Sequence, residues 1–128
     1  MSRSGARDYG FKLVFEYLFS QDFVIEDELE EESLEAEEKD YALSILNFLK
    51  ENFNEVENKL SSFLRKPLTV KDIYTLDHAI LLTSIIQIDY LKEEKGLVIN
   101  EAVRLAKKYS TDKSPSFING ILSSIYNK

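Results

Sequence analysis

The chain has 128 residues, of which 44% are apolar and 30% are charged, with a formal net charge of −7 and no cysteine. This length suits one domain, which buries enough surface to fold without a metal or a disulfide. The lack of cysteine excludes disulfides and thiolate sites. No apolar run is long enough to span a bilayer, and no apolar leader opens the chain. We therefore expect one cytoplasmic domain, residues 1–128, without a membrane partner.

Charge is unevenly distributed along the chain. Residues 21–40 hold eleven acids and one base, a net of −10, whereas the other 108 residues hold fifteen bases and twelve acids, a net of +3. The acidic segment fits a loop or a short solvated helix. It does not fit an EF-hand, because no glycine occurs between Gly10 and Gly96. Residues 95–128 hold six bases and two acids, so an anionic ligand is not excluded at that end.

Apolar residues recur at helical spacing in almost every segment. The expected helices cover residues 7–20, 37–53, 55–65, a stretch that starts near Thr69 and runs through 73–90, residues 98–109, and a final stretch that Ser114 caps. Pro67 breaks the pattern before the fourth helix, Thr69 and Asp72 resemble a capping box, and residues 92–95 form a charged turn that Gly96 ends. The fold class is all-α, a single compact bundle of about six or seven helices.

Two of these segments carry further information. Residues 73–90 are apolar on nearly every face, which is typical of the buried centre of a bundle. Pro115 follows Ser114 at the first helical position, where proline is favoured. Gly120 inside the same helix costs about 1 kcal/mol relative to alanine, so we expect close helix packing or a partner surface to require it.

Catalysis finds little support in the sequence. The one histidine, His78, is adjacent to Asp77, and neighbouring residues on a helix do not face each other. Nucleophile–base pairs and histidine-containing metal sites need more histidine or cysteine than the chain has. We expect a protein that is not an enzyme, with no cofactor and no metal.

Binding is the remaining class, and two segments favour an RNA ligand. Basic residues lie at the start of the first helix, where free backbone N–H groups suit anions. Residues 107–117 combine lysines, hydroxyl side chains, a helix start and aromatic rings, the groups that hold single-stranded RNA. The candidate RNA-binding residues are Arg3, Arg7, Lys107, Lys108, Lys113, Ser114 and Phe117.

The stretch VINEAVRLAKKYSTDKSPSFINGIL, residues 98–122, resembles the C-terminal signature of the NusB transcription antitermination family. DHAILLTSIIQIDYL, residues 77–91, resembles that family's preceding helix, and ARDYGFKLVFEYLFS, residues 6–20, resembles its first helix. The resemblance implies an all-α bundle of two helical halves. It implies binding of boxA, a short single-stranded RNA element of rRNA leader transcripts, and pairing with ribosomal protein NusE. The pair then joins the RNA polymerase antitermination complex.

Site residues follow from this resemblance position by position. Arg3 and Arg7 match the family's N-terminal arginines. Lys113, Ser114 and Phe117 fall in the loop and helix start that resemble its RNA-binding surface. Phe15 and Asp77 resemble part of its NusE-facing surface. Phe19, with Phe15, is a candidate for the same partner surface or for a homodimer that hides it.

The chain also departs from the family pattern. Ser4 and Gly5 stand where further bases are usual, Leu82 replaces a common arginine, and Gln87 replaces a common glutamate. Fewer phosphate contacts predict weaker RNA binding with a smaller salt dependence. An alternative is therefore a protein-only interaction module that has lost RNA binding. A third reading is the helical domain of some RNA cytosine methyltransferases, for which the chain lacks a cofactor-binding domain.

Overall fold

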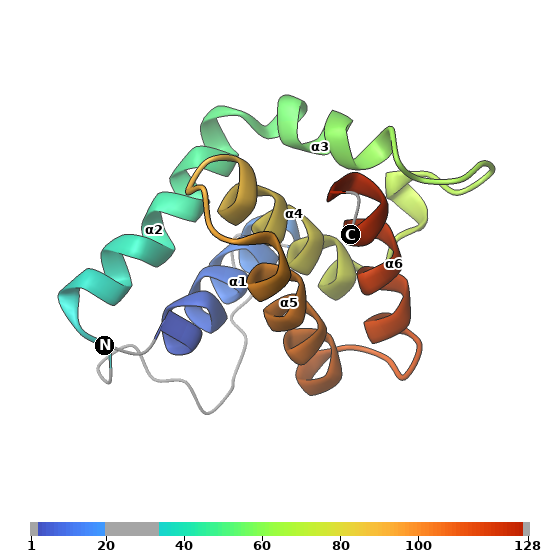
Figure 1. Cartoon of the computed structure of the whole chain (residues 1–128). Coiled ribbons are helices and arrows are strands. Elements are labelled where there is room, and N and C mark those ends of the chain that lie inside the picture. The colour runs from blue at the N-terminus through green and yellow to red at the C-terminus, as the bar shows by residue number, and fades with distance from the viewer. Residues whose placement is uncertain (1–2, 20–33, 127–128) are drawn as a thin grey trace.

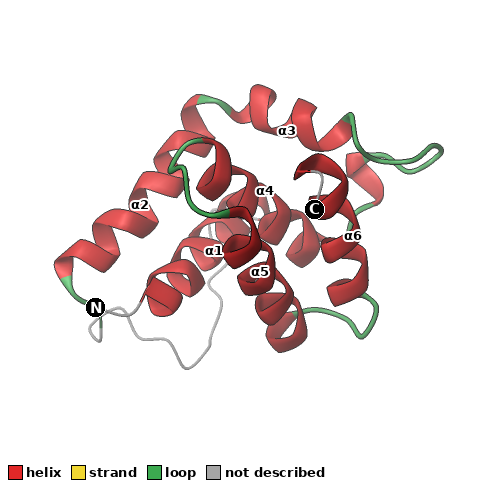
Figure 2. Cartoon of the chain, viewed as in Figure 1, coloured by secondary structure: helices red, strands yellow, loops and turns green. Residues whose placement is uncertain are grey.

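The computed structural model describes residues 3–19 and 34–126, which contain six α-helices, one 3₁₀ helix and no strand. The helices are α1 (Arg3–Phe19), α2 (Ala36–Glu51), α3 (Phe53–Ser61), η2 (Val70–Asp72, the 3₁₀ helix), α4 (Thr75–Asp89), α5 (Lys95–Tyr109) and α6 (Ser114–Tyr126). The predicted all-α bundle is confirmed, and Figure 2 shows helices joined by short loops. Residues 21–33 of the acidic segment lie outside the described residues, and its last part enters α2.

Helix α4 forms the centre of the bundle. It packs against α1 and α2 on one side and α5 and α6 on the other, and α3 also contacts it. Figure 1 shows this arrangement of two helix pairs around α4. Residues 79–88 of α4 are all buried, as the apolar pattern predicted. The two predicted halves therefore share one hydrophobic core, and α4 contributes buried side chains to both of them.

A close approach of α1 and α2 explains Gly10. A Cβ at this position would lie 3.1 Å from Ile45 Cδ1, a distance tighter than ordinary van der Waals contact. Gly120 is different, because nothing lies within 4 Å of a Cβ built there. Close helix packing is thus not the reason for Gly120, which lies exposed on α6.

Several predicted boundaries were wrong, including the start of α1, which is Arg3 and not residue 7, and the end of α3, which is Ser61 and not residue 65. The Thr69–Asp72 capping box is present but closes only η2, because Ile73 is extended and α4 starts at Thr75. Gly96 does not end a turn: the Glu94 side chain accepts from the Gly96 and Leu97 N–H groups, so α5 begins at Lys95. Glutamate is an uncommon N-cap, so the sequence did not indicate that α5 starts here.

The start of α6 also differs from the prediction by one residue. Phe117 N–H donates to the Lys113 carbonyl oxygen at 3.2 Å, so Lys113 precedes the first helical residue and Ser114 lies inside α6. The Ser114 hydroxyl accepts from the Thr111 N–H at 3.1 Å, upstream of the helix. Ser114 therefore fixes the turn before α6 and does not cap the helix.

Candidate nucleic-acid interface

Exposed cations gather where α5 ends and α6 begins. Lys107 and Lys108 lie in the last turn of α5, and Lys113 lies just before α6; all three are exposed. Lys108 Nζ lies 3.9 Å from Asp8 Oδ2 and 5.1 Å from the centre of the Tyr109 ring. Lys107 and Lys113 have no ion-pair partner within residues 3–19 and 34–126. This cluster gives an acidic chain a local positive surface.

A buried hydrogen-bond network holds the turn between these lysines. Ser110 Oγ donates to Asp77 Oδ1 at 2.5 Å and lies 2.9 Å from Ser114 Oγ. Thr111 Oγ1 lies 2.8 Å from the same Ser114 oxygen. Asp77 is 6% exposed and Ser114 only 1% exposed. The network joins the start of α4 to the turn, so the lysines on either side of it keep a fixed spacing.

The groove beside this turn lies between α5 and α6. It has a volume of about 490 Å³ and is lined by Asn100, Val103, Arg104, Lys107 and Asn119. The two amides offer donors and acceptors of the kind that read base edges, and the cations suit phosphate. Phe117, on the first turn of α6, is half-buried and packs against the core.

Arg7 lies in the interior. It is 4% exposed, and its Nη2 donates to Glu93 Oε1 at 2.7 Å, while Nη1 lies 3.8 Å from Glu101 Oε1. The Tyr41 hydroxyl donates to Glu93 as well, and Gln87 Nε2 donates to the Tyr41 oxygen at 3.0 Å. Burial and the hydrogen bond to Glu93 raise the pKa of Tyr41, which keeps the phenol neutral. Arg7 thus connects α1 to the α4–α5 turn.

The relation between Arg7 and Gln87 explains one departure noted in the sequence. Gln87, where the family pattern has an acid, contacts Tyr41, and Glu93 from the following turn supplies the carboxylate for Arg7. Arg3 is the first residue of α1. Arg7, four residues further along the same helix, is enclosed by protein.

A second ion-pair group ties α1 to α5. Arg104 donates to Asp8 Oδ1 at 2.5 Å and to Glu101 Oε1 at 3.1 Å, and Ser4 Oγ donates to Glu101 at 2.9 Å. Burial opposes ionisation of Glu101, but the hydrogen bonds from Arg104 and Ser4 lower its pKa. The Glu101–Arg104 spacing is visible in the sequence, whereas the pairing with Asp8 is not.

Two of the three predicted partner residues, Phe15 and Phe19, lie in an aromatic row on α1, whereas Asp77 lies on α4. The Phe15 and Phe19 rings stack with centroids 5.5 Å apart, and Phe11 lies 5.3 Å from Tyr109 at the end of α5. Phe15 is 6% exposed, but Phe19 is 56% exposed. Asp77 accepts a hydrogen bond from Ser110, the residue after Tyr109. Only Phe19 of the three predicted partner residues presents a large surface to solvent.

The histidine of α4, His78, pairs with an acid on another helix and not with its neighbour Asp77. His78 Nε2 lies 2.5 Å from Glu57 Oε1 on α3, and Asp77 faces away from it, as expected for neighbours on a helix. Among residues 3–19 and 34–126, no group of three acid, histidine or cysteine side chains could hold a metal ion. No helix within these ranges is long and apolar enough to cross a membrane.

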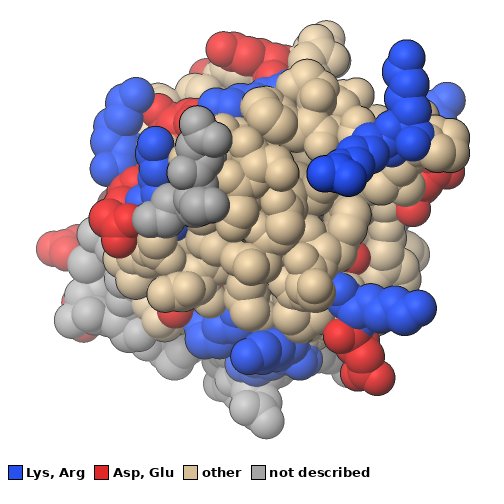
Figure 3. Space-filling model, turned by 45° about the vertical axis from the view of Figure 1, so that its right-hand side comes forward, with Lys and Arg blue, Asp and Glu red and all other residues tan. Residues whose placement is uncertain are grey.

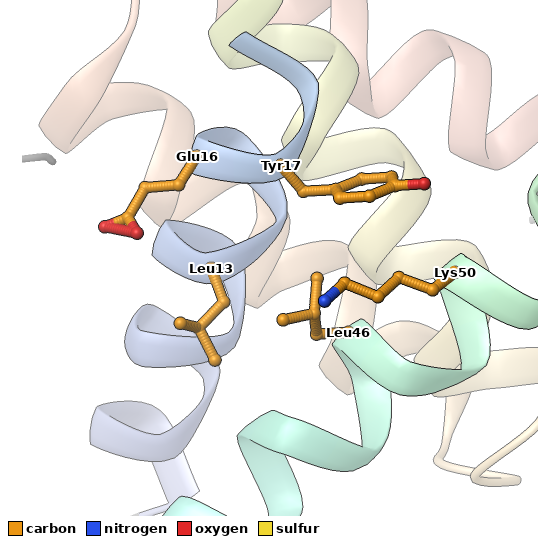
Figure 4. Close-up of a pocket in the computed structure, with 5 residues that line it drawn as sticks. All are labelled: Leu13, Glu16, Tyr17, Leu46 and Lys50. Carbon is orange, nitrogen blue, oxygen red and sulfur yellow. The ribbon is translucent and has the colours of Figure 1, made fainter. Parts of the chain in front are cut away.

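Another surface hollow, between α1 and α2, offers less chemistry. Its volume is about 350 Å³, and Figure 4 shows Leu13, Glu16 and Tyr17 of α1 opposite Leu46 and Lys50 of α2. Lys50 Nζ lies 5.7 Å from the centre of the Tyr17 ring. In the figure the Glu16 carboxylate points away from Lys50. The side chains do not converge on a common point.

Sequence reasoning missed Tyr41, Glu93 and Ser110. Glu93 pairs with a residue 86 positions away, and helical periodicity contains no signal for such a contact. Ser110 lies in the hydroxyl-rich segment, residues 107–117, that favoured an RNA ligand. The many polar side chains of this segment were the only sign in the sequence that Ser110 had a role. Its hydroxyl faces inward, so part of this polar segment supports the turn and does not contact a ligand.

The fold, the buried turn network and the basic α5–α6 surface define a small all-helical binding domain without an evident catalytic centre in its described part. Comparison with known proteins then identifies the group: residues 4–127 match the NusB family, and the chain belongs to this family. It is 31% identical over 127 residues to a protein of Aliarcobacter butzleri named transcription antitermination protein NusB, covering 97% of this chain and 96% of that one.

Solved structures show the same fold. The chain superimposes on NusB of T. maritima with a TM-score of 0.86 and 26% identity, covering 100% of this chain and 92% of that one. It also superimposes on a structure described as antitermination factors NusB and NusE in complex with dsRNA, with a TM-score of 0.81 and 24% identity, covering 98% of this chain and 96% of that one.

Proposed function

We propose that this chain is a transcription antitermination factor that binds boxA-type single-stranded RNA together with NusE. The observation that carries the proposal is the set of exposed lysines, Lys107, Lys108 and Lys113, around a turn fixed by the Asp77–Ser110 hydrogen bond. Family membership and the name of the A. butzleri relative support the same function. The protein acts by binding, in the cytoplasm, and carries out no covalent step.

Each part of the surface has a distinct role in this proposal. The lysines and Arg3 contact phosphates and position the RNA, which carries no sequence information by itself. Asn100 and Asn119 in the adjacent groove contact base edges, and the exposed part of Phe117 stacks on a base. Ser114 and Arg7, both buried, support this surface from below.

NusE completes the site. A chain with a net charge of −7 attracts RNA weakly, and a basic partner adds the positive surface that it lacks. Phe19 is the exposed anchor of the partner surface, and Phe15 and Asp77 support it from the interior. The RNA-bound pair then joins the RNA polymerase antitermination complex.

A protein-only interaction module is the second candidate function. One observation favours it: Arg7, an expected phosphate contact, is 4% exposed and pairs with Glu93 and Glu101. This reading predicts that NusE binds and that the chain adds nothing to the RNA preference of NusE.

Titration of labelled boxA-type RNA at fixed, near-physiological salt separates the two functions. The protein is tested alone and with NusE, with a scrambled RNA of equal length as control. We expect weak binding alone and at least about a tenfold preference for boxA with the pair, the lower range of specific over non-specific binding. Equal affinity with and without NusE, or for both RNAs, would contradict the antitermination function.

Charge-removing variants locate the RNA surface. We expect Lys107→Gln with Lys113→Gln to weaken RNA binding and to reduce the salt slope by about 0.7 per lost phosphate contact. The matched control is Lys12→Gln with Lys50→Gln, which removes the same charge from α1 and α2. Equal loss in both double variants would mean that net charge alone drives binding.

Oligomeric state follows from the same partner surface. If Phe19 serves a homodimer in the absence of NusE, sedimentation detects a dimer that NusE dissociates and that Phe19→Ser abolishes. A monomer at all concentrations, with or without Phe19, would remove the homodimer from the proposal.

A further inference from the structure

A second basic surface lies on the loop between α3 and η2, residues 62–69. Residues 58–71 contain Lys59, Arg65, Lys66 and Lys71 and no acid, a local net charge of +4 in a chain of −7. Lys59 is paired with Asp89 at 2.5 Å, but Arg65, Lys66 and Lys71 are exposed and have no ion-pair partner in the described part of the chain. The loop projects from the right-hand side of the molecule in Figure 1.

Exposed aromatic rings lie at the two ends of the same segment. Phe63 follows α3 and Tyr74 precedes α4, and both are exposed. Asp72 follows residues 58–71 directly, and its Oδ2 accepts hydrogen bonds from Thr69 N and Oγ1 at 2.9 and 3.1 Å. Cations interleaved with exposed rings are the composition of surfaces that hold single strands by phosphate contact and base stacking.

The surface between this loop and the α5–α6 turn carries little charge. Helix α6 has no charged residue in Ser114–Tyr126, and its outward positions include Ser116, Asn119, Gly120 and Ser124. Figure 3, with this side turned forward, shows a broad uncharged face with both basic and acidic side chains around its edges. Helix α6 spans roughly 20 Å and contributes no carboxylate itself, while Asp112 is exposed in the preceding turn and Asp89 accepts from the Tyr126 hydroxyl at the far end.

We propose that the α3–η2 loop is a second RNA contact, in which Arg65 and Lys66 bind phosphates of the strand that leaves the α5–α6 turn. The proposal rests on the RNA-binding function proposed above and adds a contact for nucleotides beyond the boxA-type core. It makes the chain sensitive to RNA length as well as sequence. Because Arg65 and Lys66 contact phosphates and not base edges, the loop accepts any base at these positions.

The test measures RNA length dependence in Arg65→Gln with Lys66→Gln. Fluorescence anisotropy is recorded for a boxA-type RNA and for the same RNA extended by about ten nucleotides at either end, a length within the reach of single-strand sites. At about 0.15 M salt, loss of two single-strand phosphate contacts predicts about a tenfold weaker affinity for one extended RNA and a salt slope smaller by about 1.4. The short RNA changes less than about twofold.

Two further variants make failure of this proposal distinct from failure of the RNA-binding function. Lys107→Gln with Lys113→Gln must weaken both RNA lengths, and Lys12→Gln with Lys50→Gln gives the effect of net charge alone. If the first pair weakens binding while the loop variant matches the net-charge control on both extended RNAs, the loop contact is refuted and the RNA-binding function stands. If the loop variant loses NusE affinity and keeps RNA affinity, the loop is a protein contact and the proposal is overturned.

Discussion

Replacing Arg7 by methionine tests whether this arginine is a structural ion-pair partner. Arg7 is 4% exposed, and its two partners, Glu93 and Glu101, each have side chains 16% exposed. Breaking a buried pair by removing one partner costs about 3–5 kcal/mol, because the remaining charge is left uncompensated. Both carboxylates keep some water contact, and Glu101 keeps Arg104. We therefore expect a loss at the lower end, about 3 kcal/mol.

This loss is a large part of the stability of a domain of this size, which is about 5–15 kcal/mol. It corresponds to a decrease in Tm of roughly 10 °C. Urea and thermal unfolding followed by far-ultraviolet circular dichroism measure it. The matched control, Lys107→Gln, removes one exposed positive charge and should change stability by less than about 0.5 kcal/mol.

A double-mutant cycle with Glu93→Gln isolates the pair itself. Because Arg7 and Glu93 lie 2.7 Å apart, we expect a coupling free energy above about 1 kcal/mol, and the double variant should lose less than the sum of the singles. If Arg7→Met costs no more than the Lys107 control and the coupling is near zero, Arg7 is not held in the interior. The assignment of Arg7 as a supporting residue would then be wrong, and a direct RNA contact would become available to it.

Three further outcomes follow from the packing and from the buried phenols. Gly120→Ala should stabilise the protein by up to about 1 kcal/mol in urea unfolding, since the added methyl group meets no atom within 4 Å; a loss would contradict the open position. Gly10→Ala should be less stable than Gly120→Ala by at least about 1 kcal/mol, because its Cβ lies 3.1 Å from Ile45 Cδ1. Burial, with Glu93 and Asp89 respectively, raises the pKa of Tyr41 and Tyr126 above 10.0, so their contribution to stability is present below pH 10 and is lost as the pH rises further. Unfolding measured from pH 9 to 11 should show this loss, and Tyr41→Phe should reduce it; an unchanged profile would refute the shift.

Helical periodicity predicted the fold because each helix has a buried stripe and α4 is buried on all sides. The boundaries were less accurate where polar side chains decide them. Glu94 starts α5 three residues before the apolar pattern begins, and Ser114 turns its hydroxyl back toward Thr111. Both effects depend on which backbone N–H group a side chain reaches, and spacing along the sequence does not specify this.

The exposure of the candidate residues was predicted in part. The lysines at the α5–α6 turn are exposed, as a phosphate-binding surface requires, because they sit on the outer side of a turn whose hydroxyls face inward. Arg7 looked equivalent to Arg3 in the sequence, but the turn after α4 brings Glu93 against it. A pairing across 86 residues arises from the tertiary fold, so composition and spacing had no means to show it.

Because α4 is central, ligand binding on one side of the molecule stabilises the helices on the other side as well. Neither helix pair can complete its hydrophobic core without α4, so the halves unfold cooperatively, as one unit. A ligand that binds only the folded state stabilises that whole unit. RNA held at the α5–α6 turn would therefore also slow amide exchange in α2, which lies outside the proposed RNA surface.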